Sequence, residues 1–143
     1  MRLSRESRYA IEALVVLAGA EGGTSMEARQ IATAANLPMA YLHKIMASLV
    51  GAGVVGSKRG KGYTLARSPR EITMHDVLSA IEGPDVFGGR CIFWREECSD
   101  AEPCELHFRW MEWRPRFEAA MAATTLEEIR AADPRDLAPD PRI

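Results

Sequence analysis

Residues 27–50, EARQIATAANLPMAYLHKIMASLV, decide the fold. Apolar side chains recur at helical spacing on both sides of an Asn-Leu-Pro break at residues 36–38. The pattern therefore predicts one helix over residues 27–35 and a second over residues 39–50, packed against each other through their apolar faces. Two helices joined by such a short break are typical of a helix-turn-helix.

A basic β-hairpin is predicted directly after this motif. Residues 54–66 read VVGSKRGKGYTLA, in which two apolar runs flank a tip rich in glycine and cations. Such a hairpin after a helix-turn-helix forms a wing. Upstream, Ser4 is placed to cap a helix that runs to about Glu21, where Gly22 and Gly23 end it.

Three further helices are predicted beyond the wing. Thr73 and Asp76 make a capping-box-like start for a helix that ends at Ile81 before a Gly-Pro pair. A long helix over residues 108–123 carries an aromatic stripe that needs a packing partner, and residues 124–131 form a short helix. The expected fold class is mainly α with a small β-hairpin, a winged helix-turn-helix followed by a long C-terminal helix.

This pattern divides the chain into four segments. We expect a winged helix-turn-helix domain at residues 1–84 and a cysteine-rich loop at residues 85–107. The long and short helices follow at residues 108–132. Residues 133–143 contain three prolines and are expected to form a flexible tail.

The 143-residue chain has the composition of an ordinary globular protein, with 47% hydrophobic and 27% charged residues. We expect a cytoplasmic protein with reduced thiols, because no apolar run reaches the roughly 18 residues of a membrane span and no secretory signal pattern is visible. Residues 1–70 hold ten Lys and Arg against four Asp and Glu, whereas residues 71–143 hold eight against sixteen. Only the first half is therefore a candidate surface for nucleic acid.

Side chains that face outward from the second helix and the wing are the candidate DNA contacts, because such a helix reads the major groove and a glycine-rich tip can approach the minor groove. Regularly spaced arginines at the start of the first helix are candidate phosphate contacts. The alternative is that the histidine and arginines are only solvated. The candidates are Met39, Ala40, Tyr41, His43 and Lys44 in the helix over residues 39–50, Lys58, Arg59 and Lys61 at the wing tip, and Arg2, Arg5 and Arg8 at the start of the helix that runs to about Glu21.

The candidate metal ligands are Cys91, Cys98, Cys104 and His107, which fall within seventeen residues. Thiolates and imidazole are the donors that zinc and iron–sulfur clusters use. Zinc modules usually contain closer cysteine pairs, so these spacings favour an iron–sulfur cluster. The polar flanks argue against three cysteines buried as small hydrophobic residues, and a thiol–disulfide switch is a further alternative.

The chain resembles the Rrf-two family of bacterial winged-helix transcription regulators, which includes the iron–sulfur assembly regulator and the nitric-oxide-sensing repressor. The resemblance covers residues 1 to about 132. The residues on which the resemblance rests are Met1-Arg2-Leu3-Ser4, Arg8-Tyr9-Ala10, Tyr41-Leu42, Arg59-Gly60 with Gly62-Tyr63, the three cysteines, and Thr125-Leu126-Glu127.

The resemblance implies a homodimer formed through the long helix, bound to a palindromic operator on double-stranded DNA, with a cluster near the dimer interface. The order of the three cysteines and His107 is similar to the ligand set of the 2Fe–2S cluster in the assembly regulator. In the nitric-oxide sensor a carboxylate from the partner's N-terminal region completes a 4Fe–4S site, and Arg8 occupies about that place here, with Glu6 close by.

Together these observations predict a transcription regulator that senses redox state, iron–sulfur status or nitric oxide through a 2Fe–2S or 4Fe–4S cluster. An enzyme is not expected, since the sequence has no phosphate-binding glycine loop, nucleophile elbow or convergent acid–base pair. We expect neither a small-molecule substrate nor a membrane partner. The alternatives are a thiol–disulfide or zinc-stabilised winged-helix regulator, or a protein-interaction module without a cluster.

Overall fold

The structure is a computed structural model that describes residues 3–88, 91, 93 and 95–132. The candidate DNA contact Arg2 and the predicted tail at residues 133–143 lie outside the described residues. In chain order the elements, with η for 3-10 helices, are α1 (Arg5–Ala18), η1 (Glu21–Gly23), α2 (Ala28–Ala34), α3 (Met39–Gly51), β1 (Val55–Lys58), β2 (Gly62–Leu65), α4 (Met74–Glu82), η2 (Pro84–Phe87), α5 (His107–Ala123) and α6 (Leu126–Ala131).

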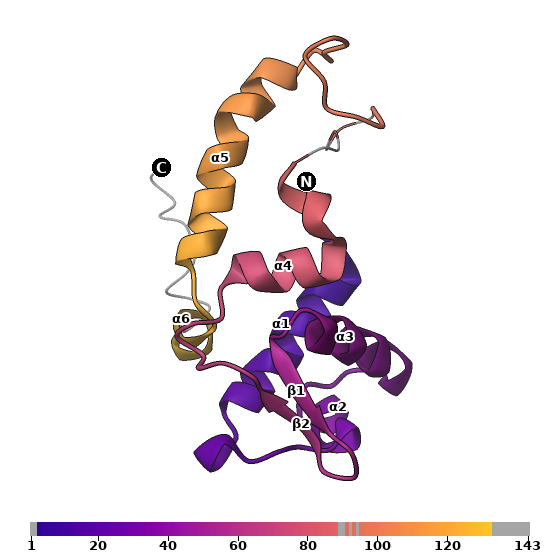
Figure 1. Ribbon diagram of the computed structural model, residues 1–143, viewed down its shortest axis with the longest axis vertical. Coiled ribbons are helices and arrows are strands. Elements are labelled where there is room, and N and C mark those ends of the chain that lie inside the picture. The colour runs from indigo at the N-terminus through magenta and orange to yellow at the C-terminus, as the bar shows by residue number, and fades with distance from the viewer. Residues whose placement is uncertain (1–2, 89–90, 92, 94, 133–143) are drawn as a thin grey trace.

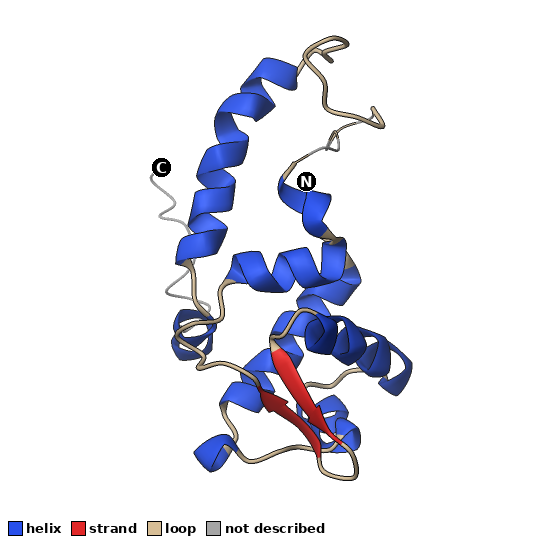
Figure 2. Cartoon of the chain, in the orientation of Figure 1, coloured by secondary structure: helices blue, strands red, loops and turns tan. Residues whose placement is uncertain are grey.

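Helices α1 to α4 and the hairpin form the body of the molecule, and α5 rises from it as a separate arm (Figure 1). The loop before α5 lies at the far end of this arm from the wing. Helices account for most of the described structure, and the antiparallel pair β1–β2 is its small sheet (Figure 2). The predicted fold class, mainly α with a small hairpin, is confirmed.

One hydrophobic core joins α1, α2, α3 and α4, because each presents an apolar stripe to the others. Burying one such Leu or Ile side chain contributes about 1.5–3 kcal/mol. The predicted inner face of α3 is confirmed. The side chains with little or no exposure include Leu14, Ile31, Leu42, Ile45, Met46, Leu49, Ile72 and Val77.

Helix α1 ends at Ala18, three residues before the predicted end at Glu21, so that boundary was wrong. Gly19 takes the C-cap position, and Ala20 is already extended. Glycine has low helix propensity, which explains why the helix stops there although apolar residues continue. The Glu21–Gly23 segment forms the separate turn η1.

The turn of the helix-turn-helix is fixed by backbone geometry. Helix α2 begins with a capping box between Glu27 and Gln30. Asn36 then takes the left-handed conformation with φ of 54°, which asparagine tolerates better than most residues. The Leu37 amide donates to the Ala32 carbonyl at 2.8 Å, which closes the turn before α3 begins.

The wing is a two-stranded hairpin with an additional attachment. Strands β1 and β2 pair from Val55↔Leu65 to Lys58↔Gly62. Outside these strands, Met26 forms an isolated bridge with Tyr63, so the segment before α2 lies beside β2. The sequence pattern did not predict this bridge, which ties the wing to the helix-turn-helix.

Helix α4 begins with the capping box of Thr73 and Asp76 that the sequence predicted. It ends at Glu82, one residue after the predicted end, and its C-cap Gly83 has a φ of 97°, which suits glycine. The Gly-Pro pair does not lead directly into a loop as predicted, because Pro84 is accommodated at the start of η2. Phe87 at the end of η2 is buried and lies against Phe117 of α5, with ring centroids 5.8 Å apart.

Helix α6 returns to the body of the molecule. Thr125 pairs with Thr73 in an isolated bridge, and the Leu126 amide donates to the Ile72 carbonyl at 2.8 Å. Leu126 is completely buried in the main core. The last described helix is therefore part of the winged-helix body, although it follows the α5 arm in sequence.

Candidate nucleic-acid interface and cysteine loop

The outward face of α3 carries the predicted recognition side chains. Met39, Ala40, His43 and Lys44 are exposed, as the helical spacing predicted. Tyr41 is half-buried, and its ring meets that of Tyr9 edge-on with centroids 5.6 Å apart. The structure therefore presents four of the five α3 candidates to solvent and uses the fifth partly for packing.

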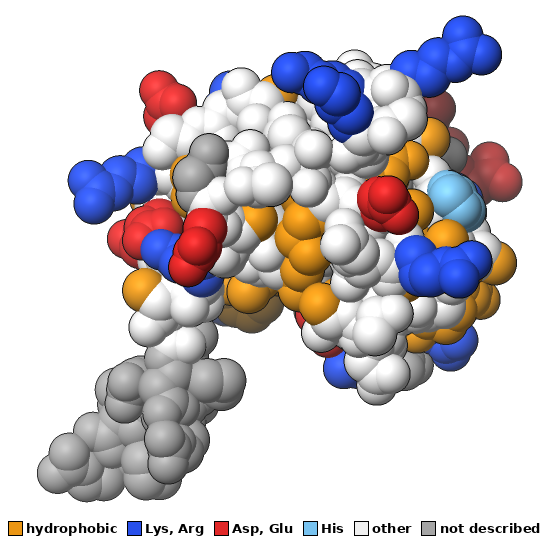
Figure 3. All heavy atoms as spheres, turned by 90° about the horizontal axis from the view of Figure 1, so that it is seen from below, with side chains coloured by type: hydrophobic (Ala, Val, Ile, Leu, Met, Phe, Trp, Pro, Cys, Tyr) orange, Lys and Arg blue, Asp and Glu red, His pale blue; other side chains and the backbone are white. Residues whose placement is uncertain are grey.

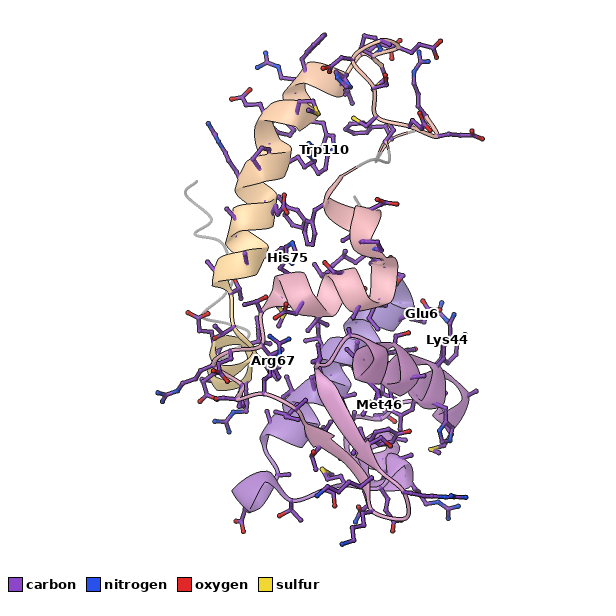
Figure 4. The ribbon with its side chains drawn as sticks, viewed as in Figure 1. Glu6, Lys44, Met46, Arg67, His75 and Trp110 are labelled. Atoms are coloured by element: carbon purple, nitrogen blue, oxygen red, sulfur yellow. The ribbon has the colours of Figure 1, made fainter. Side chains whose placement is uncertain are left out.

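Two cationic candidates lie beside carboxylates. Lys44 Nζ is 3.7 Å from Glu6 Oε1, and Figure 4 shows these side chains reaching across from α3 and α1. Arg8 Nε donates to Glu12 Oε1 at 2.9 Å, and this hydrogen bond raises the pKa of the exposed guanidinium above its ordinary value. DNA phosphate would have to compete with both carboxylates.

The cations of the wing tip have no carboxylate beside them in the described structure, and the same holds for the exposed Arg5 of α1. Lys58, Arg59 and Lys61 are all exposed, and within the described residues none of the three takes part in an ion pair. The Lys61 amide donates to the Lys58 carbonyl at 2.9 Å, which closes the tip. Figure 3, which views the molecule from below, shows Lys and Arg side chains spread around this end with acidic side chains between them.

The cysteine loop brings two predicted ligands into contact. Cys98 Sγ lies 3.4 Å from His107 Nδ1. His107 is only 2% exposed, and it is the first residue of α5, one residue before the predicted start of that helix. Its other ring nitrogen, Nε2, lies 2.6 Å from Asp100 Oδ1.

The remaining two thiols lie in the same loop. Cys104 is buried and Cys91 is half-buried. Burial raises the pKa of the Cys98 thiol, and the negative charge of a Cys91 thiolate adds to this effect more than Arg114 opposes it. In the parts of the chain that are described, however, no three His, Cys, Asp or Glu side chains are grouped closely enough to hold a metal ion.

The donor types in this loop fit a thiophilic metal or an iron–sulfur cluster. Three thiols and an imidazole are suitable ligands, and His107 already shows the arrangement of many metal-binding histidines, with one nitrogen against a carboxylate and the other facing a second ligand. Trp110, one turn further along α5, is buried, and its indole N–H has no hydrogen-bond partner in the described structure. Figure 4 shows Trp110 on the inner side of the arm.

Sequence reasoning did not identify Asp100 as part of this site. No periodicity in an acidic loop distinguishes one carboxylate from its neighbours, so only the fold shows that Asp100 contacts His107. It also missed the pairing of Glu6 with Lys44, because the two residues lie on different helices. No described helix is long and apolar enough to cross a bilayer.

Comparison with known proteins agrees with this architecture. The CymR regulator of Bacillus subtilis (strain 168) is 31% identical over 131 residues, which cover 90% of this chain and 89% of that protein. The IscR regulator of Pectobacterium carotovorum subsp. carotovorum (strain PC1) is 32% identical over 133 residues, covering 90% of this chain and 79% of that protein.

Solved structures give the same result. The structure of CymR, the global cysteine regulator of B. subtilis, matches with a TM-score of 0.73 at 29% identity, over 93% of this chain and 98% of that one. IscR of T. potens matches with a TM-score of 0.72 at 26% identity, over 98% and 94%.

The family model that matches residues 3–132 is Rrf2, described as an iron-dependent transcriptional regulator. The relatives are transcription regulators and not enzymes. The chain therefore belongs to the Rrf2 family of winged-helix, DNA-binding transcription regulators.

Proposed function

We propose that this regulator acts in the cytoplasm as a homodimer on a palindromic operator, and that an iron–sulfur cluster in the cysteine loop controls its affinity for DNA. The observation that carries the cluster proposal is the Cys98–His107–Asp100 arrangement at the start of α5. The nearby thiols of Cys91 and Cys104 supply the further donors.

In the DNA complex, the first turns of α3 would enter the major groove. His43 and Lys44 are then the exposed α3 candidates whose side chains can hydrogen-bond base edges or phosphates, while the half-buried Tyr41 has only its phenol O–H to offer. The wing cations Lys58, Arg59 and Lys61 would contact phosphate or the minor groove, and Arg5 and Arg8 would contact the backbone beside α1. The three wing cations and Arg5 have no carboxylate partner in the described structure, so these four side chains would supply most of the salt-dependent affinity.

Salt titration on a short mixed-sequence duplex tests this DNA interface. The slope of log affinity against log salt should decrease by about 1 for each wing cation that contacts a phosphate. The triple variant K58Q/R59Q/K61Q removes all three cations, and R109Q is the control, because Arg109 is an exposed arginine on α5 far from the wing. An unchanged slope in the triple variant would exclude the wing as the phosphate contact.

The dimer proposal rests on apolar surface left exposed on the arm. Phe108 is 71% exposed and Trp113 is 55% exposed, although aromatic side chains of this size usually find a packing partner. Pairing of two α5 helices would cover this surface. A two-fold dimer places two α3 helices in a symmetric arrangement, which explains why a palindromic operator is expected.

A bound cluster would supply a group whose charge and integrity respond to oxidants, iron supply or nitric oxide. The protein's contribution is to present soft donors from one loop at the N-terminal end of α5. Cys98 and His107 would ligate directly, together with Cys91 and Cys104, and the Trp110 indole N–H would be available to donate to a sulfur atom.

Anaerobic purification followed by absorption spectroscopy and iron and sulfide assays tests the cluster. We expect a coloured protein containing both iron and inorganic sulfide, and loss of both in C98S and C104S. S99A is the matched control, because Ser99 adjoins Cys98 but offers no soft donor. A colourless protein that holds zinc would contradict the cluster proposal and indicate a structural metal. A protein that instead forms a disulfide on mild oxidation would indicate a thiol switch.

A further inference from the structure

We infer that Asp100 is a positioning residue that holds the His107 imidazole so that Nδ1 faces the thiol of Cys98. This inference rests on the proposed function, because it assigns Asp100 a role in soft-metal binding by that loop. Neither the sequence pattern nor the spacing of the cysteines pointed to this carboxylate.

The hydrogen-bond chemistry fixes the direction of each contact. An ionised carboxylate can only accept a hydrogen bond, so with Asp100 ionised the 2.6 Å contact to its Oδ1 requires the proton to be on His107 Nε2. A neutral imidazole protonated at Nε2 has its lone pair on Nδ1. That lone pair faces Cys98 Sγ at 3.4 Å, which is the direction from which a shared metal would be bound.

Burial makes this orientation specific. His107 is 2% exposed, whereas the Asp100 side chain is 85% exposed. The imidazole is thus enclosed by the protein, and its Nε2 contacts a carboxylate that is itself open to solvent. Removing the carboxylate would leave the ring free to adopt the other tautomer, with the proton on Nδ1 and no lone pair directed at the thiol.

An ordinary structural contact predicts a different outcome. Asp100 is an exposed partner, so a purely structural pair would contribute little to stability, and its loss would not change the His107 tautomer or the affinity for a metal. If Asp100 positions the ring, its loss changes both the His107 tautomer and the affinity for a metal. Carboxylates behind metal-binding histidines typically alter metal affinity by about 10–100-fold when they are removed.

The experiment uses the full chain in metal-free form and with Co²⁺ as the probe. Nitrogen-15 NMR of metal-free protein reports the His107 tautomer, and the sulfur-to-cobalt charge-transfer band reports Co²⁺ binding through thiolate. The variants are D100A, the conservative D100N, whose amide oxygen still accepts from Nε2, and E102A as the matched control. Glu102 is an equally exposed acid in the same loop, and its only ion pair in the described residues is with Arg95 at 4.0 Å.

We expect wild type and E102A to hold the proton on Nε2 and to bind Co²⁺ with equal affinity. D100A should populate the Nδ1–H tautomer and bind Co²⁺ about 10–100-fold more weakly, while D100N should keep the tautomer and lose less affinity. If D100A matches E102A in tautomer and affinity, the inference is wrong. If wild type binds no Co²⁺, the proposed metal function fails, and the tautomer in metal-free D100A still decides whether Asp100 positions the ring.

Discussion

Replacing Gly62 by alanine tests how the wing is attached to the helix-turn-helix. Gly62 has φ of +86°, and a Cβ at this position would overlap the Met26 carbonyl oxygen and lie 2.6 Å from its carbon. The obstacle is backbone, so it cannot rotate away as a side chain would. Moving it would break the two hydrogen bonds that join Met26 and Tyr63, at 2.9 and 2.8 Å.

The expected loss has two components. A left-handed conformation costs a non-glycine residue about 1–2 kcal/mol. Two backbone hydrogen bonds contribute about 0.5–1.5 kcal/mol each, so their loss adds about 1–3 kcal/mol. G60A is the control, because Gly60 has a similar φ of +74° but a Cβ there would meet no described atom within 4 Å. G60A should therefore lose only the stability that corresponds to the cost of the left-handed conformation, about 1–2 kcal/mol.

Urea unfolding and amide hydrogen exchange provide the measurements. G62A should be about 1–3 kcal/mol less stable than G60A. The Met26 and Tyr63 amides should lose protection in G62A alone, and the affinity for DNA should fall because the wing is released from α2. Equal stability of the two variants, with both amides still protected, would refute the attachment that we infer.

Three further predictions concern the body of the domain. L126A should destabilise the protein by about 3–5 kcal/mol in urea unfolding, because Leu126 is fully buried; a loss below about 1 kcal/mol would show that α6 is not part of the core. Burial raises the pKa of Glu82, but hydrogen bonds from Ser4 and Ser7 outweigh this and lower it overall. The stability that this carboxylate contributes is therefore present at pH values above the ordinary glutamate pKa, and it is lost as the pH falls through the lowered pKa. E82Q should be less stable than wild type at neutral pH, and the two stabilities should converge in acid. E6Q should raise affinity for mixed-sequence DNA up to about fivefold at low salt, since it frees Lys44 from a partly exposed pair contributing at most about 1 kcal/mol; unchanged affinity would place Lys44 away from DNA.

The elements that the sequence predicted correctly are those with a local physical signature. The break before α3, the capping box of Thr73 and Asp76, and the hairpin around a glycine-rich tip each depend on residues close together in the chain. Two features were not predictable in this way. The Met26–Tyr63 bridge and the burial of Leu126 join segments far apart in sequence, and periodicity indicates that a face is apolar without showing what covers it.

The candidate site shows the same limit. The spacing of the cysteines indicated a ligand-rich loop, because polar neighbours in the sequence offered no packing explanation for the thiols, although Cys104 is in fact buried. It did not show that Cys98 and His107 are the pair in contact, nor that Asp100 completes their arrangement. Those facts depend on where α5 begins. Placing His107 in its first turn directs the ring back over the loop.

The way α5 is attached determines how a change in the loop can reach DNA. Along its length, α5 contacts α4 through the pair of His75 Nε2 and Glu118 Oε1, which are 3.3 Å apart. It also contacts Phe87 of η2, whose ring stacks on His75 with the ring centroids 4.5 Å apart. The His75–Glu118 pair is partly solvent-exposed and therefore contributes less than a core contact, whereas Phe87 is buried. The C-terminal end of α5 leads into α6, which packs on α1, the helix that carries Arg5.

A shift of α5 would therefore act on the same body that holds the recognition helix and the wing. A group bound in the loop alters DNA affinity only to the extent that it prefers one position of α5 over another. Variants that loosen the His75 contact, such as E118Q, should therefore leave metal binding by the loop unchanged and reduce the difference in DNA affinity between the metal-free and metal-bound protein. If that difference persisted in full, the signal would have to pass through the Phe87–Phe117 ring contact or through α6.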